Sequence, residues 1–80
     1  MVILDEYECF IEQDENPEIN TIFVEVYSNS DPIISDISSE VVNDDTAFFN
    51  GYYGKILDVT VDSPGKQTYL KIKTRRVDKR

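Results

Sequence analysis

The stretch KILDVTVDSPGKQTYLKIKT, residues 55–74, decides the fold that this sequence predicts. Apolar and polar residues alternate over 55–62 and again over 67–74, and a period of two is the pattern of a strand with one buried face. Between the two runs, Pro64 followed by Gly65 suits the centre of a type II turn. The stretch therefore predicts an antiparallel β-hairpin.

The register of this hairpin can be tested for consistency. If Pro64 and Gly65 form the turn centre, apolar residues face apolar residues and a carboxylate faces a cation, which are pairings that stabilise a sheet. The predicted pairs are Leu57 with Ile72, Val59 with Leu70, Asp58 with Lys71, and Thr60 with Tyr69. The residues expected on the buried face are Leu57, Val59, Val61, Leu70 and Ile72.

Two earlier runs also alternate. Residues 20–27 and residues 2–12 each place apolar side chains on one face, so each predicts a strand. The buried-face residues expected in these runs are Ile22, Val24 and Val26, and Ile3, Tyr7, Cys9 and Ile11. The opposite face of residues 2–12 carries Glu6, Glu8 and Glu12, and that of residues 20–27 carries Glu25.

A second hairpin is predicted around Asn50-Gly51, because both central residues of a type I′ turn take a positive φ. Four aromatic residues bracket this turn: Phe48, Phe49, Tyr52 and Tyr53. In a regular hairpin two of the four point away from the core, where they would suit a partner; alternatively, they hold the hairpin against the sheet.

Residues 32–42 are ambiguous. Asp31 would cap a helix that has Pro32 at its first position, and Ile33, Ile37 and Val41 recur at helical spacing. The same apolar residues also alternate as a strand would, and β-branched residues and serine weaken a helix. A short helix or turn is favoured, and a strand remains the alternative.

These elements predict a mainly β fold, either a small antiparallel sheet or a five-stranded SH3-like barrel, with one short helix or turn around residues 32–42. Eighty residues suffice for one domain close to the lower size limit of an unstapled core. We expect a single acidic β domain over residues 1–75 and a basic C-terminal tail over residues 76–80.

Residues 49–74 resemble part of an SH3-like or KOW-type small barrel. The resemblance rests on Gly51 and Gly54 ahead of a strand, followed by a Pro-Gly turn and a second strand. It covers about a third of the chain and implies an architecture only. KOW-type modules are basic where they meet RNA, whereas this chain is acidic.

Charge is sorted along the chain, whose net charge is −8. Residues 1–62 hold fifteen of the sixteen carboxylates and a single cation, Lys55, while residues 63–80 hold the other seven cations. Such a field repels nucleic acid and acidic membranes and attracts basic surfaces of other proteins. We therefore expect no direct nucleic-acid binding and no membrane association, and a basic tail that partly neutralises the sheet.

The compartment is expected to be the cytoplasm. Cys9 is the only cysteine, and a lone thiol fits a reducing environment. The N-terminus turns acidic at Asp5, unlike a signal peptide, and no apolar run approaches the ~20 residues that a membrane span needs.

The residues for common catalytic chemistry are missing, so we expect no enzyme, no cofactor and no metal. The chain has no histidine, and Cys9 lies beside Glu8 and Phe10, which would raise its thiol pKa. No phosphate-binding loop, nucleophile elbow or dinucleotide motif is present. The carboxylate pairs Asp14-Glu15, Asp44-Asp45 and Asp58/Asp62 lack the spacing of a calcium loop.

The outward carboxylates suggest a binding function. Residues i and i+2 on a strand lie about 6.6–6.8 Å apart, which is similar to the separation of successive phosphates along a nucleic-acid backbone. A carboxylate-lined sheet could therefore occupy a basic cleft meant for DNA or RNA, with steep salt dependence. Ordinary charge for solubility is the alternative explanation.

Our hypothesis from the sequence is a stoichiometric inhibitor or adaptor that engages a basic nucleic-acid-handling protein by mimicry. Small acidic proteins without catalytic residues are typical of phage or mobile-element counter-defence. The alternative is an assembly module that forms a homo-oligomer through strand edges and the aromatic hairpin. The partner-binding residues predicted are Glu6, Glu8, Glu12, Glu25, Asp44, Asp45, Phe49, Tyr52, Tyr53, Asp58 and Asp62.

Overall fold

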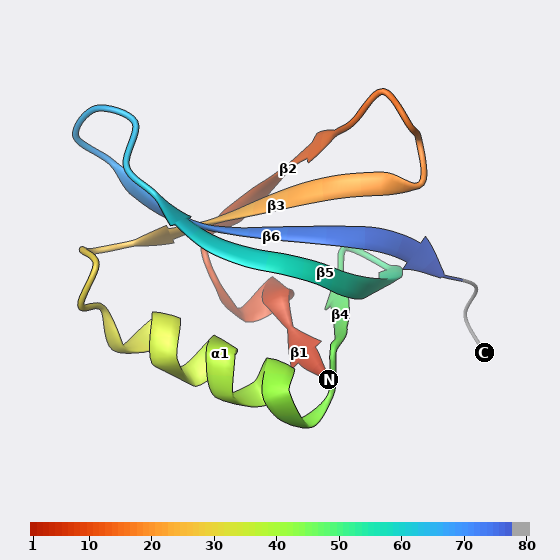
Figure 1. Ribbon diagram of the computed structural model, residues 1–80, viewed down its shortest axis with the longest axis horizontal. Coiled ribbons are helices and arrows are strands. Elements are labelled where there is room, and N and C mark those ends of the chain that lie inside the picture. The colour runs from red at the N-terminus through yellow and green to blue at the C-terminus, as the bar shows by residue number, and fades with distance from the viewer. Residues whose placement is uncertain (78–80) are drawn as a thin grey trace.

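A computed structural model describes residues 1–77 and shows a curled sheet with one helix beneath it (Figure 1). The sheet has six strands in the order β1-β4-β5-β6-β3-β2, and only the β1–β4 pair is parallel. The elements are β1 (Val2–Ile3), the 3₁₀ helix η1 (Leu4–Glu6), β2 (Cys9–Gln13), β3 (Ile19–Val26), α1 (Pro32–Asn43), β4 (Thr46–Phe49), β5 (Tyr52–Asp62) and β6 (Thr68–Val77).

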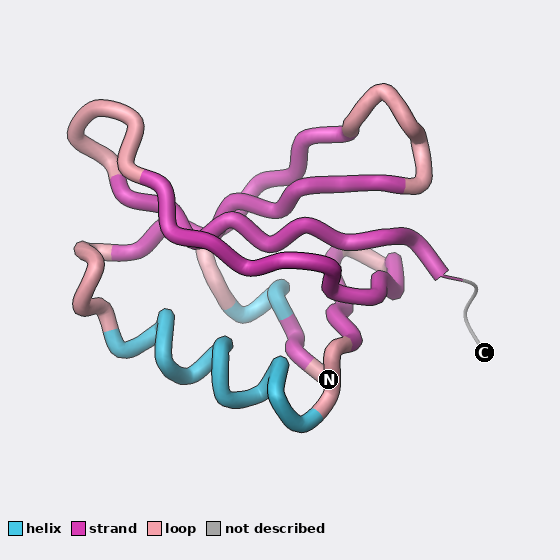
Figure 2. Tube along the Cα trace, in the orientation of Figure 1, coloured by secondary structure: helices cyan, strands magenta, loops and turns pink. Residues whose placement is uncertain are grey.

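The prediction of a mainly β, barrel-like fold with one short helix is confirmed. The sheet curls into a half-barrel rather than closing, since β1 and β2 lie at its two ends. It has six strands where five were expected, and the additional parallel pair comes from the short β1. Figure 2 shows α1, η1 and β1 together on the concave side of the sheet.

The helix forms as the capping pattern predicts. The Asp31 side chain accepts a hydrogen bond of 3.0 Å from the Ile33 N–H, and Pro32 occupies the first helical position. Ile37 is fully buried, while Ile33 and Val41 pack at the margin of the core. The helical alternative for residues 32–42 is therefore the correct one.

The core fills the space between the concave face of the sheet and the helix. It combines residues from five strands with Leu4 of η1 and Ile37 of α1. Its members are Val2, Leu4, Ile22, Val24, Val26, Ile37, Ala47, Ile56, Leu70 and Ile72. The buried faces predicted for residues 20–27 and for the strand after the Pro-Gly turn are confirmed.

The hairpin of residues 55–74 forms, but its predicted register is wrong by two residues. Asp58 pairs with Lys73 and Asp62 pairs with Tyr69. The turn is longer than two residues, and a hydrogen bond of 3.1 Å between the Ser63 and Thr68 hydroxyls closes it. A shift of two keeps every side chain on its face, because the side-chain period of a strand is also two.

A β-bulge between Ile56 and Asp58 overturns the predicted burial of Leu57. The extra residue reverses the faces on the N-terminal side of the bulge, so Ile56 is 7% exposed and Leu57 is 46% exposed. Val61, also expected inside, is 44% exposed. It lies on the inward face next to Leu70, but at the end of the hairpin near the turn.

The predicted single strand over residues 2–12 is broken. β1 pairs with β4 at one end of the sheet, and β2 pairs with β3 at the other. The chain must cross the concave side between these ends, and it does so through η1, whose turn is closed by the Tyr7 N–H donating to the Leu4 carbonyl. Glu6 therefore lies in η1 and not on a strand face.

β6 continues to Val77, so Arg76 belongs to a strand and not to a tail. Residues 78–80, the remainder of the predicted basic tail, lie outside the described residues. Within residues 1–77, no helix is long and apolar enough to cross a membrane.

Candidate functional site

The convex face of the sheet carries most of the predicted carboxylates. Cross-strand pairing aligns β2, β3, β6 and β5 side by side, so their outward side chains form rows. One row contains Phe10, Phe23, Lys71 and Thr60, and the next contains Glu12, Thr21, Lys73 and Asp58. A third row contains Glu25, Tyr69 and Asp62, with Glu8 next to Glu25.

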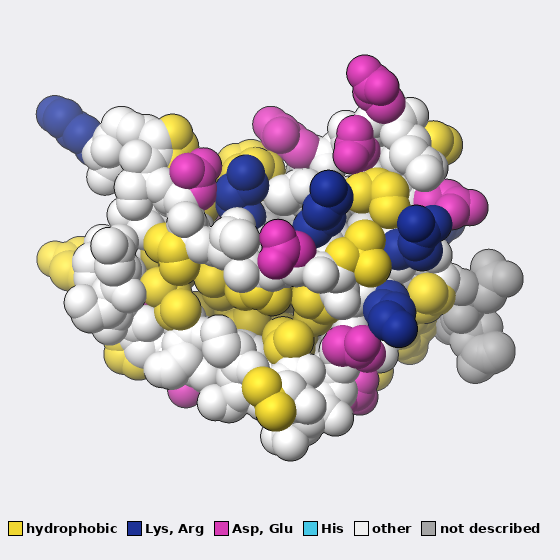
Figure 3. Space-filling model, in the orientation of Figure 1, with side chains coloured by type: hydrophobic (Ala, Val, Ile, Leu, Met, Phe, Trp, Pro, Cys, Tyr) yellow, Lys and Arg dark blue, Asp and Glu magenta, His cyan; other side chains and the backbone are white. Residues whose placement is uncertain are grey.

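This face is not a continuous acidic surface. β6 lies between β3 and β5, and it places Lys73 between Glu12 and Asp58, and Tyr69 between Glu25 and Asp62. Figure 3 shows the resulting interleaving of basic and acidic side chains over the sheet. Asp58 is thus separated from Glu12 by Lys73, and a phosphate-like row of negative charge does not run across this face.

Aromatic residues occupy the centre of the face, and sequence reasoning missed them. The Phe10 and Phe23 rings stack with centroids 4.9 Å apart, and Tyr69 meets them edge-on at 5.6 and 5.7 Å. The Lys71 ammonium lies 5.7 Å from the Phe23 ring centroid. Strand alternation could have found this cluster, because Phe10 lies between Glu8 and Glu12 on the face predicted to point outward.

A second group of carboxylates lies on the helix side, and its charges act on Tyr7. We call Tyr7, Glu6, Asp36 and Glu40 the Tyr7 surface. Burial and then the negative charges of Glu6, Glu40 and Asp36 raise the pKa of Tyr7 above its ordinary value. The three carboxylates are exposed, and within residues 1–77 none of them forms an ion pair.

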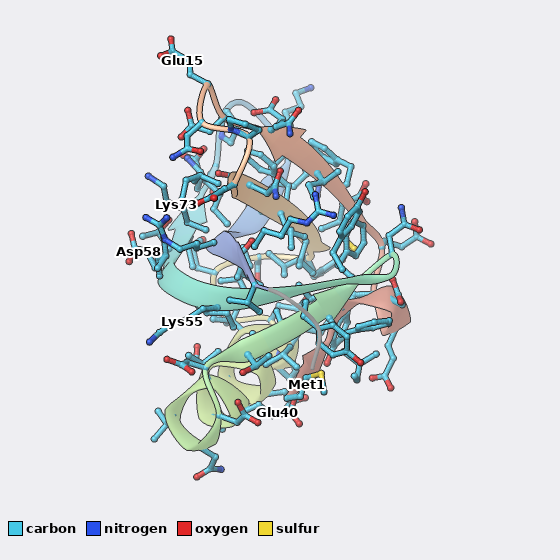
Figure 4. The ribbon with its side chains drawn as sticks, turned by 90° about the vertical axis from the view of Figure 1, so that its right-hand side faces the viewer. Met1, Glu15, Glu40, Lys55, Asp58 and Lys73 are labelled. Atoms are coloured by element: carbon cyan, nitrogen blue, oxygen red, sulfur yellow. The ribbon has the colours of Figure 1, made fainter. Side chains whose placement is uncertain are left out.

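Figure 4 shows the separation of the two regions: Glu40 lies at the helix end of the molecule, away from Asp58 and Lys73 on the sheet. Of the Tyr7 surface, only Glu6 was predicted as a binding residue. Asp36 and Glu40 were missed, although their spacing of four on a helix places them on one face.

Asp44 and Asp45 were predicted to bind a partner, but their side chains already have partners in the fold. The N-terminal ammonium lies 3.1 Å from the Asp44 carboxylate, which also accepts the Thr46 N–H. These hydrogen bonds lower the pKa of Asp44, the N-terminal ammonium most strongly. The Asp45 carboxylate lies 3.8 Å from the Lys55 ammonium.

The aromatic hairpin adopts its predicted turn, with φ of 51° at Asn50 and 85° at Gly51. Of its four aromatics, Tyr52 is the most exposed, at 47%, and the Arg76 guanidinium lies 4.4 Å from its ring centroid. Phe48 and Tyr53 pack with centroids 5.0 Å apart, and Phe49 is half-buried. The hairpin is therefore mostly held against the sheet.

Cys9 is half-buried, and its thiol lies 3.4 Å from the Leu4 carbonyl, to which it donates. Burial, followed by the charges of Asp5 and Glu8, raises its pKa and keeps the thiol protonated. No group of three metal-ligating side chains occurs within residues 1–77. A small hollow lined by residues that include Ile22, Ala47 and Phe49 holds about 20 Å³, enough for one water molecule.

Comparison of the chain with protein-family models, with curated proteins and with solved structures yields no match.

Proposed function

We propose that this chain is a small acidic binding protein, without enzymatic activity, that engages a protein partner through that partner's basic surface. It acts by occupancy, as a stoichiometric inhibitor or adaptor. The observation that supports this most is the Tyr7 surface, where the charges of three exposed carboxylates raise the pKa of one phenol. These carboxylates have no cation in ion-pair contact among residues 1–77.

The composition around this surface supports the proposal. The first 54 residues contain no lysine or arginine, and the Tyr7 surface lies entirely within them. The cations of β6 lie across the sheet from it, so they compensate the carboxylates of the convex face instead. A partner with lysines or arginines would find here three exposed carboxylates that no ion pair of the described chain engages.

We further propose that the partner's basic surface is one that otherwise holds phosphates. Asp36 and Glu40, four residues apart on α1, have Cβ atoms about 5–6 Å apart, a spacing that two neighbouring phosphate-binding cations could engage. We assign the mimicry to the helix side and not to the convex face, because Lys73 and Tyr69 lie between the carboxylates of the convex face. Phage or mobile-element counter-defence is the kind of role that such occupancy would serve.

The test is affinity capture from a lysate of the source cell or its host, with elution by a salt gradient. The wild-type chain is compared with a triple variant of the Tyr7 surface and with a control of equal charge change at sites outside that surface. The triple variant is Glu6→Gln, Asp36→Asn and Glu40→Gln, and the control is Asp14→Asn, Glu15→Gln and Asp62→Asn.

We expect a nucleic-acid-binding protein that the wild type and the control retain, that the triple variant loses, and that added nucleic acid displaces. Equal loss by both variants would mean that net charge alone attracts the partner. Retention by the triple variant, or release that ignores salt, would contradict the proposal.

The alternative, an assembly module, would depend on the aromatic hairpin. Tyr52 is its main exposed ring, and Arg76 already covers it. The alternative predicts that sedimentation shows self-association, which Tyr52→Ala weakens more than any carboxylate substitution does.

A further inference from the structure

β2 is one of the two outermost strands of the sheet, and one of its edges is not covered by any other strand of residues 1–77. Among these residues it pairs with β3 only, and it stands at the end of the strand order. In Figure 1 no other element lies beyond β2 on this side of the sheet. Its residues after Cys9 are all exposed, including Phe10 at 43% and Ile11 at 41%.

Hydrogen bonds of the residues just before and just after β2 show which main-chain groups of the strand do not bond to β3. The Glu25 N–H donates to the Glu8 carbonyl at 2.9 Å, and the Asp14 N–H donates to the Ile19 carbonyl at 3.0 Å. In an antiparallel pair, hydrogen-bonded and non-hydrogen-bonded residues alternate. The even-numbered residues of this strand therefore bond to β3, and Cys9, Ile11 and Gln13 direct their N–H and C=O groups outward.

Free edges of this kind accept an added strand, and natural proteins usually protect them. Proline is absent from β2, and its only charged side chain is Glu12. Glu8 immediately precedes the strand on the same face, so two carboxylates flank Phe10. The edge therefore offers three main-chain positions beside an alternating pattern of acid, aromatic, acid.

We propose that the β2 edge binds an extended basic segment of a partner protein by strand addition. Two cations of that segment lie beside Glu8 and Glu12, and an apolar residue between them lies beside Phe10. On the other face, an apolar residue opposite Ile11 enters the hollow of about 200 Å³ that Ile11, Tyr52 and Arg76 help to line.

Charge complementarity favours this occupant over a second copy of the chain. If two copies paired through β2 about Ile11, Glu8 of each would face Asp14 of the other, and both chains carry a net charge of −8. Like charges directly opposite one another destabilise a sheet. A segment with lysine or arginine in place of those carboxylates would be attracted instead.

The inference deepens the proposed function and depends on it for the basic character of the partner, but it concerns a different surface. The test uses the peptide acetyl-Thr-Lys-Val-Val-Val-Lys-Thr-amide. Its two lysines would lie beside Glu8 and Glu12 on the convex face, and its central valine would lie beside Phe10. When its central valine lies beside Phe10 in an antiparallel pair, its third and fifth residues direct their N–H groups to β2, whereas its fourth and sixth direct theirs away.

Hydrogen exchange measured by NMR gives the first result. In the free protein we expect the amides of Phe10 and Glu12 to be protected by β3, and those of Cys9, Ile11 and Gln13 to exchange fast. Addition of the peptide should protect these three amides. If they are already protected in the free protein in a concentration-dependent way, a second copy occupies the edge and the inference is overturned.

N-methylated peptides give the second result. Methylation of the third and fifth residues removes two main-chain donors and should weaken binding about tenfold or more, whereas methylation of the fourth and sixth should leave affinity unchanged. Equal effects of the two methylations would show that charge alone binds the peptide, and would overturn strand addition.

Protein variants provide a matched control. Ile11→Pro removes the outward N–H without removing a bond to β3, so it should abolish peptide binding, while Ile11→Thr keeps that N–H and should retain most of it. The Tyr7-surface triple variant should bind the peptide as the wild type does. If the peptide does not bind as expected but the capture experiment gives its expected result, strand addition is refuted and the Tyr7 surface is not. If the peptide binds as expected but the capture experiment fails, the Tyr7 surface is refuted and strand addition is not.

Discussion

The attachment of α1 to the sheet depends on one side chain to an extent that can be measured. Ile37 is the only fully buried residue of the helix, whereas Ile33, Ile34 and Val41 pack only partly against the core. Replacement of a buried isoleucine by alanine costs about 2–5 kcal/mol. Alanine is the better helix former and returns about 0.4 kcal/mol, so we expect Ile37→Ala to lower the free energy of unfolding by about 2–4 kcal/mol.

This loss is a large fraction of the total stability, which for a domain of this size is about 4–12 kcal/mol. The assay is urea denaturation followed by far-ultraviolet circular dichroism. With a urea slope of about 1 kcal/mol/M, the midpoint should fall by about 2 M or more. The neighbouring residue is the control: Val42 is 85% exposed, and Val42→Ala should change stability by less than about 0.5 kcal/mol.

An identical urea midpoint for Ile37→Ala and Val42→Ala would show that burial of Ile37 against the sheet contributes nothing to stability. A two-step transition in Ile37→Ala would instead show that the helix detaches while the sheet persists. That result would also bear on function, since α1 carries Asp36 and Glu40 of the Tyr7 surface.

Three further predictions follow from individual groups. Hydrogen bonds from the Tyr27 and Ile33 N–H groups lower the pKa of Asp31. The stability that this carboxylate contributes is therefore present above its unfolded pKa of 3.8 and is lost as the pH falls through the lower folded value. When urea titrations are repeated at decreasing pH below about 4, the free energy of unfolding of Asp31→Asn should fall less than that of the wild type. Gly54→Ala would place a Cβ 3.0 Å from the Thr74 Cβ and should cost about 1–3 kcal/mol in thermal unfolding; an unchanged melting temperature would show that β5 and β6 are not so close there. Glu40→Gln should lower the pKa of Tyr7 in an ultraviolet titration, whereas a shift of the same size from Glu15→Gln would contradict the placement of Glu40 near the phenol.

Local patterns predicted the elements well because each depends on neighbouring residues. Asp31 followed by Pro32 marks the start of the helix, Asn50 followed by Gly51 marks the type I′ turn, and alternation assigned the faces of β3 and β6. In each case the deciding interaction is a cap, a backbone conformation or a period that a short stretch of chain contains.

Features that depend on distant partners were not predictable. The bulge at Leu57 moves Ile56 inside, but nothing in the alternation of residues 55–62 marks the extra residue. The break at η1 arises because β1 and β2 join opposite ends of the sheet. Pairing by apolar matches could not distinguish the two hairpin registers, because Val59 meets an apolar residue in both.

The site was predicted least well because charge sorted along the chain is not sorted in the same way in space. The basic segment becomes β6, and the strand order places β6 between β5 and β3. On the convex face Lys73 therefore lies beside Asp58 of β5, and Arg75 forms an ion pair with Glu18, which precedes β3. An extended acidic sheet would have required β6 at an edge, and strand order is a property of the whole fold.

The same insertion explains where the net charge of −8 remains uncompensated. In β6, Lys73 lies beside Asp58 of β5, and Arg75 lies 3.1 Å from Glu18. The core separates these cations from the helix, and β3 separates them from the free edge of β2. Neither the Tyr7 surface nor the β2 edge has a carboxylate in an ion pair with a cation of β6 among residues 1–77. A partner that brings its own cations can thus use either surface without displacing an ion pair of the described fold, which is why both proposals lead to the same class of partner.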